Sequence, residues 1–183
     1  MRKLLRVIML LIITSCQSQS NIYKNIENLK NEYNEQNAGK IRISLGKDFK
    51  PTKTIIRKLK SELKSNNVIY VFSWKNTMPI AHTNKFRSLL YEIETQKKYY
   101  ANNLADNYKD IVVENKGNQY FIDEEYILKE YLKMNNLDSL KPYEHQSNSA
   151  EMGDSYYLFD TKSNKVYYLE DLVFIKGKFS KYD

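Results

Sequence analysis

Two glutamates near the middle of the chain, Glu92 and Glu94, have the residue type and spacing closest to a catalytic pattern. They alternate with Tyr91 and Ile93 as residues of a strand do, so their side chains would share one face about 7 Å apart. Carboxyl groups at this separation can perform acid–base catalysis on a glycoside or bind a cation. The polar face of a half-buried strand gives the same pattern more often. We therefore keep a carboxylate-dependent hydrolase as an alternative function and predict no catalytic residues.

Other residue types that support catalysis are not arranged for it. The two histidines, His82 and His145, lie far apart in predicted loops, and no histidine or cysteine has a partner at metal-ligand spacing. The sequence has neither a glycine-rich phosphate loop nor a Gly-x-Ser-x-Gly motif. It therefore predicts no metal site and no cofactor.

Four basic residues recur at helical spacing in a segment predicted to be a helix, residues 51–65. At 100° per residue they fall within an arc of about 60°, which borders the apolar face that the helix would bury. They are Lys53, Arg57, Lys60 and Lys64. Such a stripe can be simply the solvated face of a helix, or it can meet anionic lipid. Because the segment has no aromatic side chain for insertion into lipid, we predict that the stripe binds an acidic protein partner.

Tyrosine is abundant, with 16 copies, and two adjacent pairs could form an aromatic platform for a sugar or a protein. The pairs are Tyr99-Tyr100 and Tyr167-Tyr168. Neighbouring side chains on a strand point to opposite faces, so one tyrosine of each pair should lie in the core. The other ring of each pair leaves glycan binding as a second alternative function.

The N-terminus carries a pattern of a different kind. Three bases, Arg2, Lys3 and Arg6, precede the apolar run Val7–Ile13, which leads into Ile13-Thr14-Ser15-Cys16. Seven apolar residues are too few to cross a hydrocarbon core, which needs about twenty. A branched aliphatic residue, two small residues and a cysteine resemble the lipobox of bacterial lipoprotein precursors, and the stretch before them resembles the export signal of that family.

This resemblance implies that residues 1–15 are a signal peptide and that Cys16, then N-terminal, carries the lipid. Cys16 is the only cysteine, so lipidation would leave no thiol for a disulfide, a metal or catalysis. Two or three acyl chains give durable anchoring. The resemblance therefore implies a bacterial cell-envelope protein that is lipid-anchored to a membrane and faces the periplasm or the exterior. Residues 16–20 would be the lipidated cysteine and a short tether, whose Gln17–Ser20 part reaches at most about 14 Å.

Charge and length narrow the function classes further. The formal net charge is +7, and the three signal-peptide bases account for +3 of it, which leaves +4 for the mature chain. So modest a balance does not indicate nucleic-acid binding. Residues 21–183 suffice for one domain that buries roughly 70% of its unfolded surface.

Hydrophobic periodicity predicts three helices, and the paired apolar runs predict hairpins. The helices cover residues 22–39, 51–65 and 123–135. The last of them should begin at Asp123 as N-cap and bury Ile127, Leu128, Tyr131 and Leu132. Strands are expected at 41–45 and 68–74, in hairpins over 86–100, 111–122 and 157–168, and at 172–175.

The continuous apolar run from Val68 to Phe72 predicts a central strand covered on both faces, with Phe72 and Trp74 in the core. The whole pattern predicts an α+β domain, a mostly antiparallel sheet of hairpins with about three helices. Together with the lipobox, it favours a lipid-anchored envelope protein that binds a protein partner, as an immunity or assembly lipoprotein does.

Overall fold

The computed structural model describes residues 22–38, 50–75, 86–102, 112–117, 121–144, 154–175 and 178–179. Several predictions fall outside these residues: the signal peptide, Cys16 with its tether, the strand at 41–45, His82 and His145. The side chain of Trp74 also lies outside the described part. Within the described residues, no helix is both long and apolar enough to cross a membrane.

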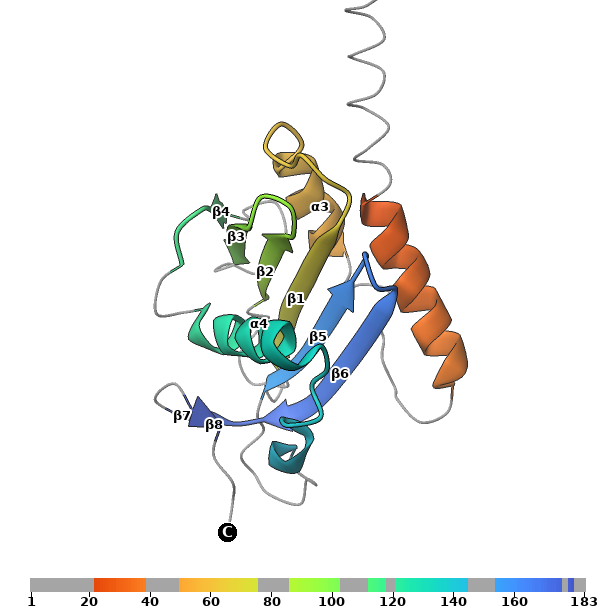
Figure 1. Ribbon diagram of the computed structural model, residues 1–183, viewed down its shortest axis with the longest axis vertical. Coiled ribbons are helices and arrows are strands. Elements are labelled where there is room, and N and C mark those ends of the chain that lie inside the picture. Colours follow the sequence, from red (N-terminus) through yellow and green to blue (C-terminus); the bar gives the residue numbers. More distant parts are fainter. Residues whose placement is uncertain are drawn as a thin grey trace, which may run out of the picture.

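Six strands form one antiparallel sheet in the order β4-β3-β2-β1-β5-β6 (Figure 1). The bounds are β1 Val68–Lys75, β2 Arg87–Glu92, β3 Lys97–Asn102, β4 Val112–Glu114, β5 Asp154–Asp160 and β6 Lys165–Leu172. Two short strands, β7 Phe174–Ile175 and β8 Lys178–Phe179, pair separately. The mostly antiparallel α+β fold predicted from the sequence is confirmed, and so is the central position of β1, which pairs with β2 and β5.

Helices cover both faces of this sheet. A helix over residues 22–36 and α3, Lys50–Lys58, lie on one face, and α4, Ile122–Met134, crosses the other (Figure 1). A single 3₁₀ turn, η3 Lys141–Tyr143, follows α4. Within the described residues this gives three α-helices, as the periodicity predicts.

Two apolar cores result, one on each side of the sheet. Alternate residues of β1 divide between them: Tyr70 and Phe72 pack under α3 and the helix over 22–36, whereas Ile69 and Val71 pack under α4. The Phe72 ring is 1% exposed and stacks on the Tyr157 ring at 5.0 Å between centroids. In a strand covered on both faces, side chains at successive positions are all buried, which explains the continuous apolar run from Val68 to Phe72.

The second helix is shorter than predicted, because α3 ends at Lys58 instead of continuing to residue 65. Turns follow, in which the N–H groups of Glu62 and Leu63 both donate to the carbonyl of Leu59. These turns keep Leu59 and Leu63 buried without a continuous helix.

The predicted hairpin over 111–122 is wrong. Val112–Glu114 of its first half are β4, which pairs with β3. Phe121 and Ile122, predicted to end its second strand, are instead the N-cap and first residue of α4, so the N-cap is not Asp123; residues 118–120 lie outside the described residues. Leu132 was expected in the core but is 50% exposed. The other three residues of the predicted face, Ile127, Leu128 and Tyr131, are buried as expected.

Candidate functional site

Glu92 is the last residue of β2, and its side chain is fully buried. One carboxylate oxygen accepts the backbone N–H groups of Lys64 and of Ser65, the latter at 2.6 Å. The other oxygen accepts the hydroxyl of Thr95. Both oxygens are therefore engaged in holding the connection between α3 and β1 and the turn between β2 and β3.

Glu94 does not share a strand face with Glu92, because β2 has ended and Glu94 lies in the turn. It is exposed and accepts the side-chain amide of Asn67. Hydrogen bonds from Ser65 and Asn67 lower the pKa of this carboxyl group. The prediction that Glu92 and Glu94 share one strand face is therefore wrong, and both carboxylates instead accept hydrogen bonds from the connection between α3 and β1.

The four residues of the predicted basic stripe are all exposed, but they do not lie on one helix. Lys53 and Arg57 belong to α3, and the Lys53 ammonium lies 5.7 Å from the centre of the Tyr23 ring. Lys60 and Lys64 lie in the connection after the helix, Lys60 in a turn and Lys64 beyond it, so helical angles do not apply to them. Two of the four basic residues therefore lie on α3, and the other two lie on the connection between α3 and β1.

The tyrosine pairs do not form an exposed platform. Tyr99 and Tyr100 are both buried, one in each core, because the sheet is covered on both faces. Tyr168 stacks on Tyr157 at 4.7 Å between centroids, and Tyr167 packs edge-on against Tyr131. These rings support the fold instead of presenting a sugar-binding surface.

A polar cluster that the sequence did not predict lies at the other end of the sheet, beneath the start of α4. The Arg87 guanidinium lies 3.0 Å from a carboxylate oxygen of each of Asp123, Glu124 and Asp154. Tyr156 donates its hydroxyl to Asp123 at 2.9 Å. In the described part of the chain, no three acidic, histidine or cysteine side chains are placed to hold a metal ion.

Glu124 is the fully buried carboxyl group of this cluster. Burial raises its pKa to about 7, even though the adjacent Arg87 lowers it. Desolvation outweighs the ion pair here because the side chain is fully buried, while Arg87 is shared with two other carboxylates. The cluster fixes α4 on the sheet through one arginine.

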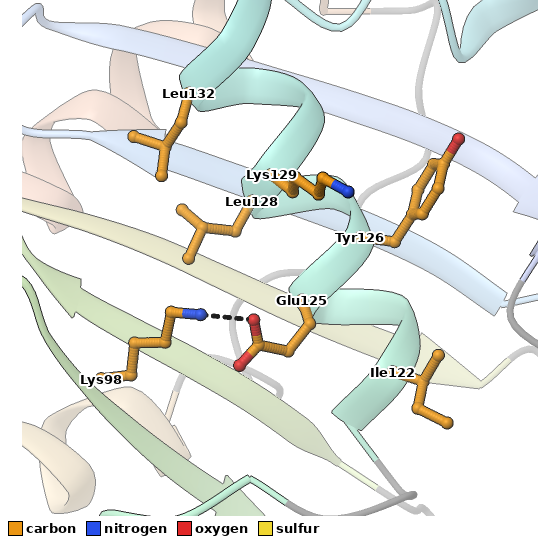
Figure 2. Close-up of a pocket in the computed structure, with 7 residues that line it drawn as sticks. All are labelled: Lys98, Ile122, Glu125, Tyr126, Leu128, Lys129 and Leu132. Carbon is orange, nitrogen blue, oxygen red and sulfur yellow. Dashed lines mark hydrogen bonds and ion pairs between the residues drawn. The ribbon is translucent and has the colours of Figure 1, made fainter.

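An apolar groove of about 390 Å³ lies along α4, between the helix and β3. Ile122 and Leu132 line it and are 43% and 50% exposed. Figure 2 shows Leu128, Leu132 and Glu125 projecting toward the side on which Lys98 extends from β3. The α4 groove, as we call it, therefore offers aliphatic side chains beside charged ones.

Of the two lysines that line the α4 groove, Lys98 forms an ion pair with a residue that the structure describes and Lys129 does not. Glu125 accepts both the Lys98 ammonium, at 2.5 Å, and the Tyr100 hydroxyl. Burial and the Glu125 hydrogen bond raise the pKa of Tyr100, so its hydroxyl stays a donor. Lys129 also lines the groove, and no carboxylate of the described residues lies within ion-pair distance of it. The groove therefore has a net charge of +1, from Lys129, next to its aliphatic side chains.

Sequence reasoning missed the polar cluster because its members come from β2, α4 and β5, with no spacing pattern to connect them. The α4 groove had a partial signal, since Leu132 repeats Leu128 at helical spacing, but periodicity assigned both to the core. No protein-family model matches the chain, and neither a curated protein nor a solved structure matches it.

Proposed function

We propose that the chain is a lipid-anchored protein of the bacterial cell envelope whose domain binds an acidic protein partner and catalyses no reaction. The lipobox ending at Cys16 supports the anchor. The observation that carries the binding role is the α4 groove, in which Ile122 and Leu132 stand exposed along one helix. Aliphatic side chains exposed together in a concave surface are typical of protein interaction sites.

The groove also indicates the chemistry of the partner. An aliphatic side chain would fill the space between Leu128 and Leu132, and full burial of a leucine contributes about 1.5–3 kcal/mol. Lys129 favours an acidic residue next to that side chain, since Glu125 is already shared by two donors. The acidic partner predicted for the basic stripe is thus assigned to this groove instead.

A hydrolase centred on Glu92 and Glu94 remains the alternative function. The non-catalytic role is supported by the bonds of Glu92, since each of its oxygens holds a donor of a neighbouring connection. Glycan binding by the tyrosine pairs is less favoured because Tyr99 and Tyr100 are buried.

The anchor is tested by Cys16→Ser in cells that express the full chain. We expect the variant to lose the acyl mass seen for the wild type by mass spectrometry and to leave the membrane fraction, because the thiol is the only attachment point for the diacylglycerol. Unchanged mass and membrane association would contradict the anchor.

The binding role is tested by Leu132→Asp, with Met134→Asp as the matched control. Both side chains are exposed to a similar degree on α4, but Met134 does not line the groove. We expect proteins that co-purify with the wild type from envelope extracts to bind Leu132→Asp at least tenfold more weakly and Met134→Asp as before, because a buried leucine accounts for about that factor. Equal retention in both variants, or equal loss, would contradict the groove as the binding surface.

A further inference from the structure

Three chain connections meet at one end of the sheet. In the β-sheet register, Val68 lies opposite Glu92, and Asp160 lies opposite Lys165. The connection over 59–67 and the turns over 93–96 and 161–164 therefore share that end. Hydrogen bonds join them, since the N–H of Ile93 donates to Asn67 and that of Thr161 donates to Val68. We call residues 59–67, 93–97 and 161–165 the turn end.

Acidic and basic groups are segregated at the turn end. Glu92 and Asp160 are buried beneath it and accept backbone N–H groups of its connections, among them those of Lys64 and of Lys162. The side chains of these two lysines are exposed, as is that of Lys97. The turn end contains five lysines and two glutamates, a formal net charge of +3; four of the lysines are exposed, and Lys165 is half-buried and donates to the Asn135 carbonyl. The hydrogen-bonded carboxylates hold the backbone under a basic surface.

The helix over 22–36 begins at this end of the molecule. Its first turn contains Tyr23, whose ring lies next to Lys53 of α3. Near its other end, burial and the Glu144 carboxylate raise the pKa of Tyr33, and Glu144 pairs with Leu172, the last residue of β6. The helix thus runs in the same direction as β6, away from the turn end (Figure 1).

The position of residue 22 sets the distance to the anchor. Six residue steps separate Cys16 from Ile22 and span at most about 22 Å when fully extended. With lipid on Cys16, the end of the domain that faces the headgroups is therefore the turn end. Taking the lipid anchor of the proposed function as given, we propose that the turn end docks electrostatically on anionic lipid headgroups of the membrane that holds Cys16.

The contact is with headgroups and not with acyl chains. Among the described residues, the exposed large apolar side chains are Ile122, Leu132 and Met134, and all three lie on α4, outside the turn end. Docking therefore depends on lysine charge, which contributes about a fivefold change in population per lysine at an anionic surface and is screened by salt.

The experiment uses the full lipidated chain in nanodiscs, either of phosphatidylcholine alone or of equal parts phosphatidylglycerol and phosphatidylcholine. A fluorophore on Ser163→Cys reports energy transfer to an acceptor on the lipid headgroups. Since lipid occupies the natural cysteine, the introduced thiol is the single labelling site. Glu170→Cys is the control position, because Glu170 is exposed and lies five residues from Lys165 along β6, about 17 Å from the turn end.

We expect stronger transfer from position 163 in the phosphatidylglycerol discs than in phosphatidylcholine alone, and a smaller response at position 170. High salt, or the double variant Lys97→Glu with Lys162→Glu, should reduce transfer at position 163 to the phosphatidylcholine value. Lys141→Glu, a reversal in η3 outside the turn end, should not.

Equal transfer in both lipids, or transfer that neither salt nor the double reversal changes, would overturn the docking while leaving the anchor intact. Absence of the acyl mass in the same preparation would overturn the anchor and the docking with it. A response of position 163 to added envelope protein, with none to phosphatidylglycerol, would identify the turn end as a protein contact and also overturn the proposal.

Discussion

Glu92 accepts the backbone N–H of Ser65 at 2.6 Å, and this bond connects the end of β2 to a segment 27 residues earlier in the chain. The same carboxylate accepts the N–H of Lys64, a group that would bond within the helix if α3 continued. The end of the helix and the burial of Glu92 therefore depend on each other. Glu92, whose residue type suggested acid–base chemistry, therefore stabilises the connection between α3 and β1.

Glu92→Gln should lower the free energy of unfolding by about 2 kcal/mol. The amide keeps the shape of the side chain but loses the charge, and hydrogen bonds to charged groups contribute about 1.5–3 kcal/mol. Urea unfolding of the two proteins under the same conditions measures the difference.

Glu94→Gln is the matched control, since Glu94 is exposed and two residues away. We expect its effect to stay within about 0.5 kcal/mol, as is usual for surface substitutions. Equal destabilisation by both changes would contradict the structural role of Glu92. A hydrolytic activity lost in both variants would favour the alternative function.

Phe72→Ala should destabilise the protein by about 3–5 kcal/mol, the usual cost of a large cavity in a core. The Phe72 ring lies between the Tyr157 and Phe159 rings of β5 and the Phe86 ring, with centroid distances of 5.0, 6.0 and 5.9 Å. Met134→Ala, at a half-exposed position, should change stability by no more than about 0.5 kcal/mol. An unchanged urea midpoint for Phe72→Ala would show that this layer of rings does not stabilise the domain.

The spacing of apolar residues predicted the correct helix or strand where burial alone determines the structure. The run Val68–Phe72 predicted a central strand, and the spacing of Ile22, Ile26 and Leu29 predicted a helix, because each pattern matches one buried surface. Asn135 has the left-handed backbone expected where a helix ends, and α4 stops just before it. These features need only neighbours along the chain.

The predictions were wrong where contacts with residues far away in the sequence determine the local structure. Nothing local to 59–65 shows that Glu92 will bind its backbone, so the apolar spacing there predicted a longer helix. Phe121 and Ile122 resemble a strand in isolation, but the acidic residues that follow them pair with Arg87 of β2, which lies far away in the sequence. The α4 groove was missed for the same reason: only the position of α4 against β3 leaves Leu132 outside the core.

The pH dependence of stability should follow Glu124. Burial raises the pKa of this carboxyl group to about 7 in the folded protein, from an ordinary value near 4.5. The surrounding groups are Arg87, Asp123, Asp154 and Tyr156. Because the folded pKa is the higher one, the folded state holds the proton more tightly than the unfolded state between these two values. Stability from this group is therefore greatest at the acid end of that window and falls as the pH rises, by about 3 kcal/mol in total.

Glu124→Gln should remove this slope, because glutamine exchanges no proton, while Arg87 keeps Asp123 and Asp154 as partners at 3.0 Å. The free energy of unfolding, measured by urea titration at several pH values from about 4.5 to 7, should fall with pH in the wild type and stay flatter in the variant. Asp138→Asn removes an exposed carboxylate, 67% exposed, and should leave the wild-type slope unchanged. If wild type and Glu124→Gln lose stability in parallel across this range, Glu124 is ionised throughout, and the ion pair with Arg87 outweighs its desolvation.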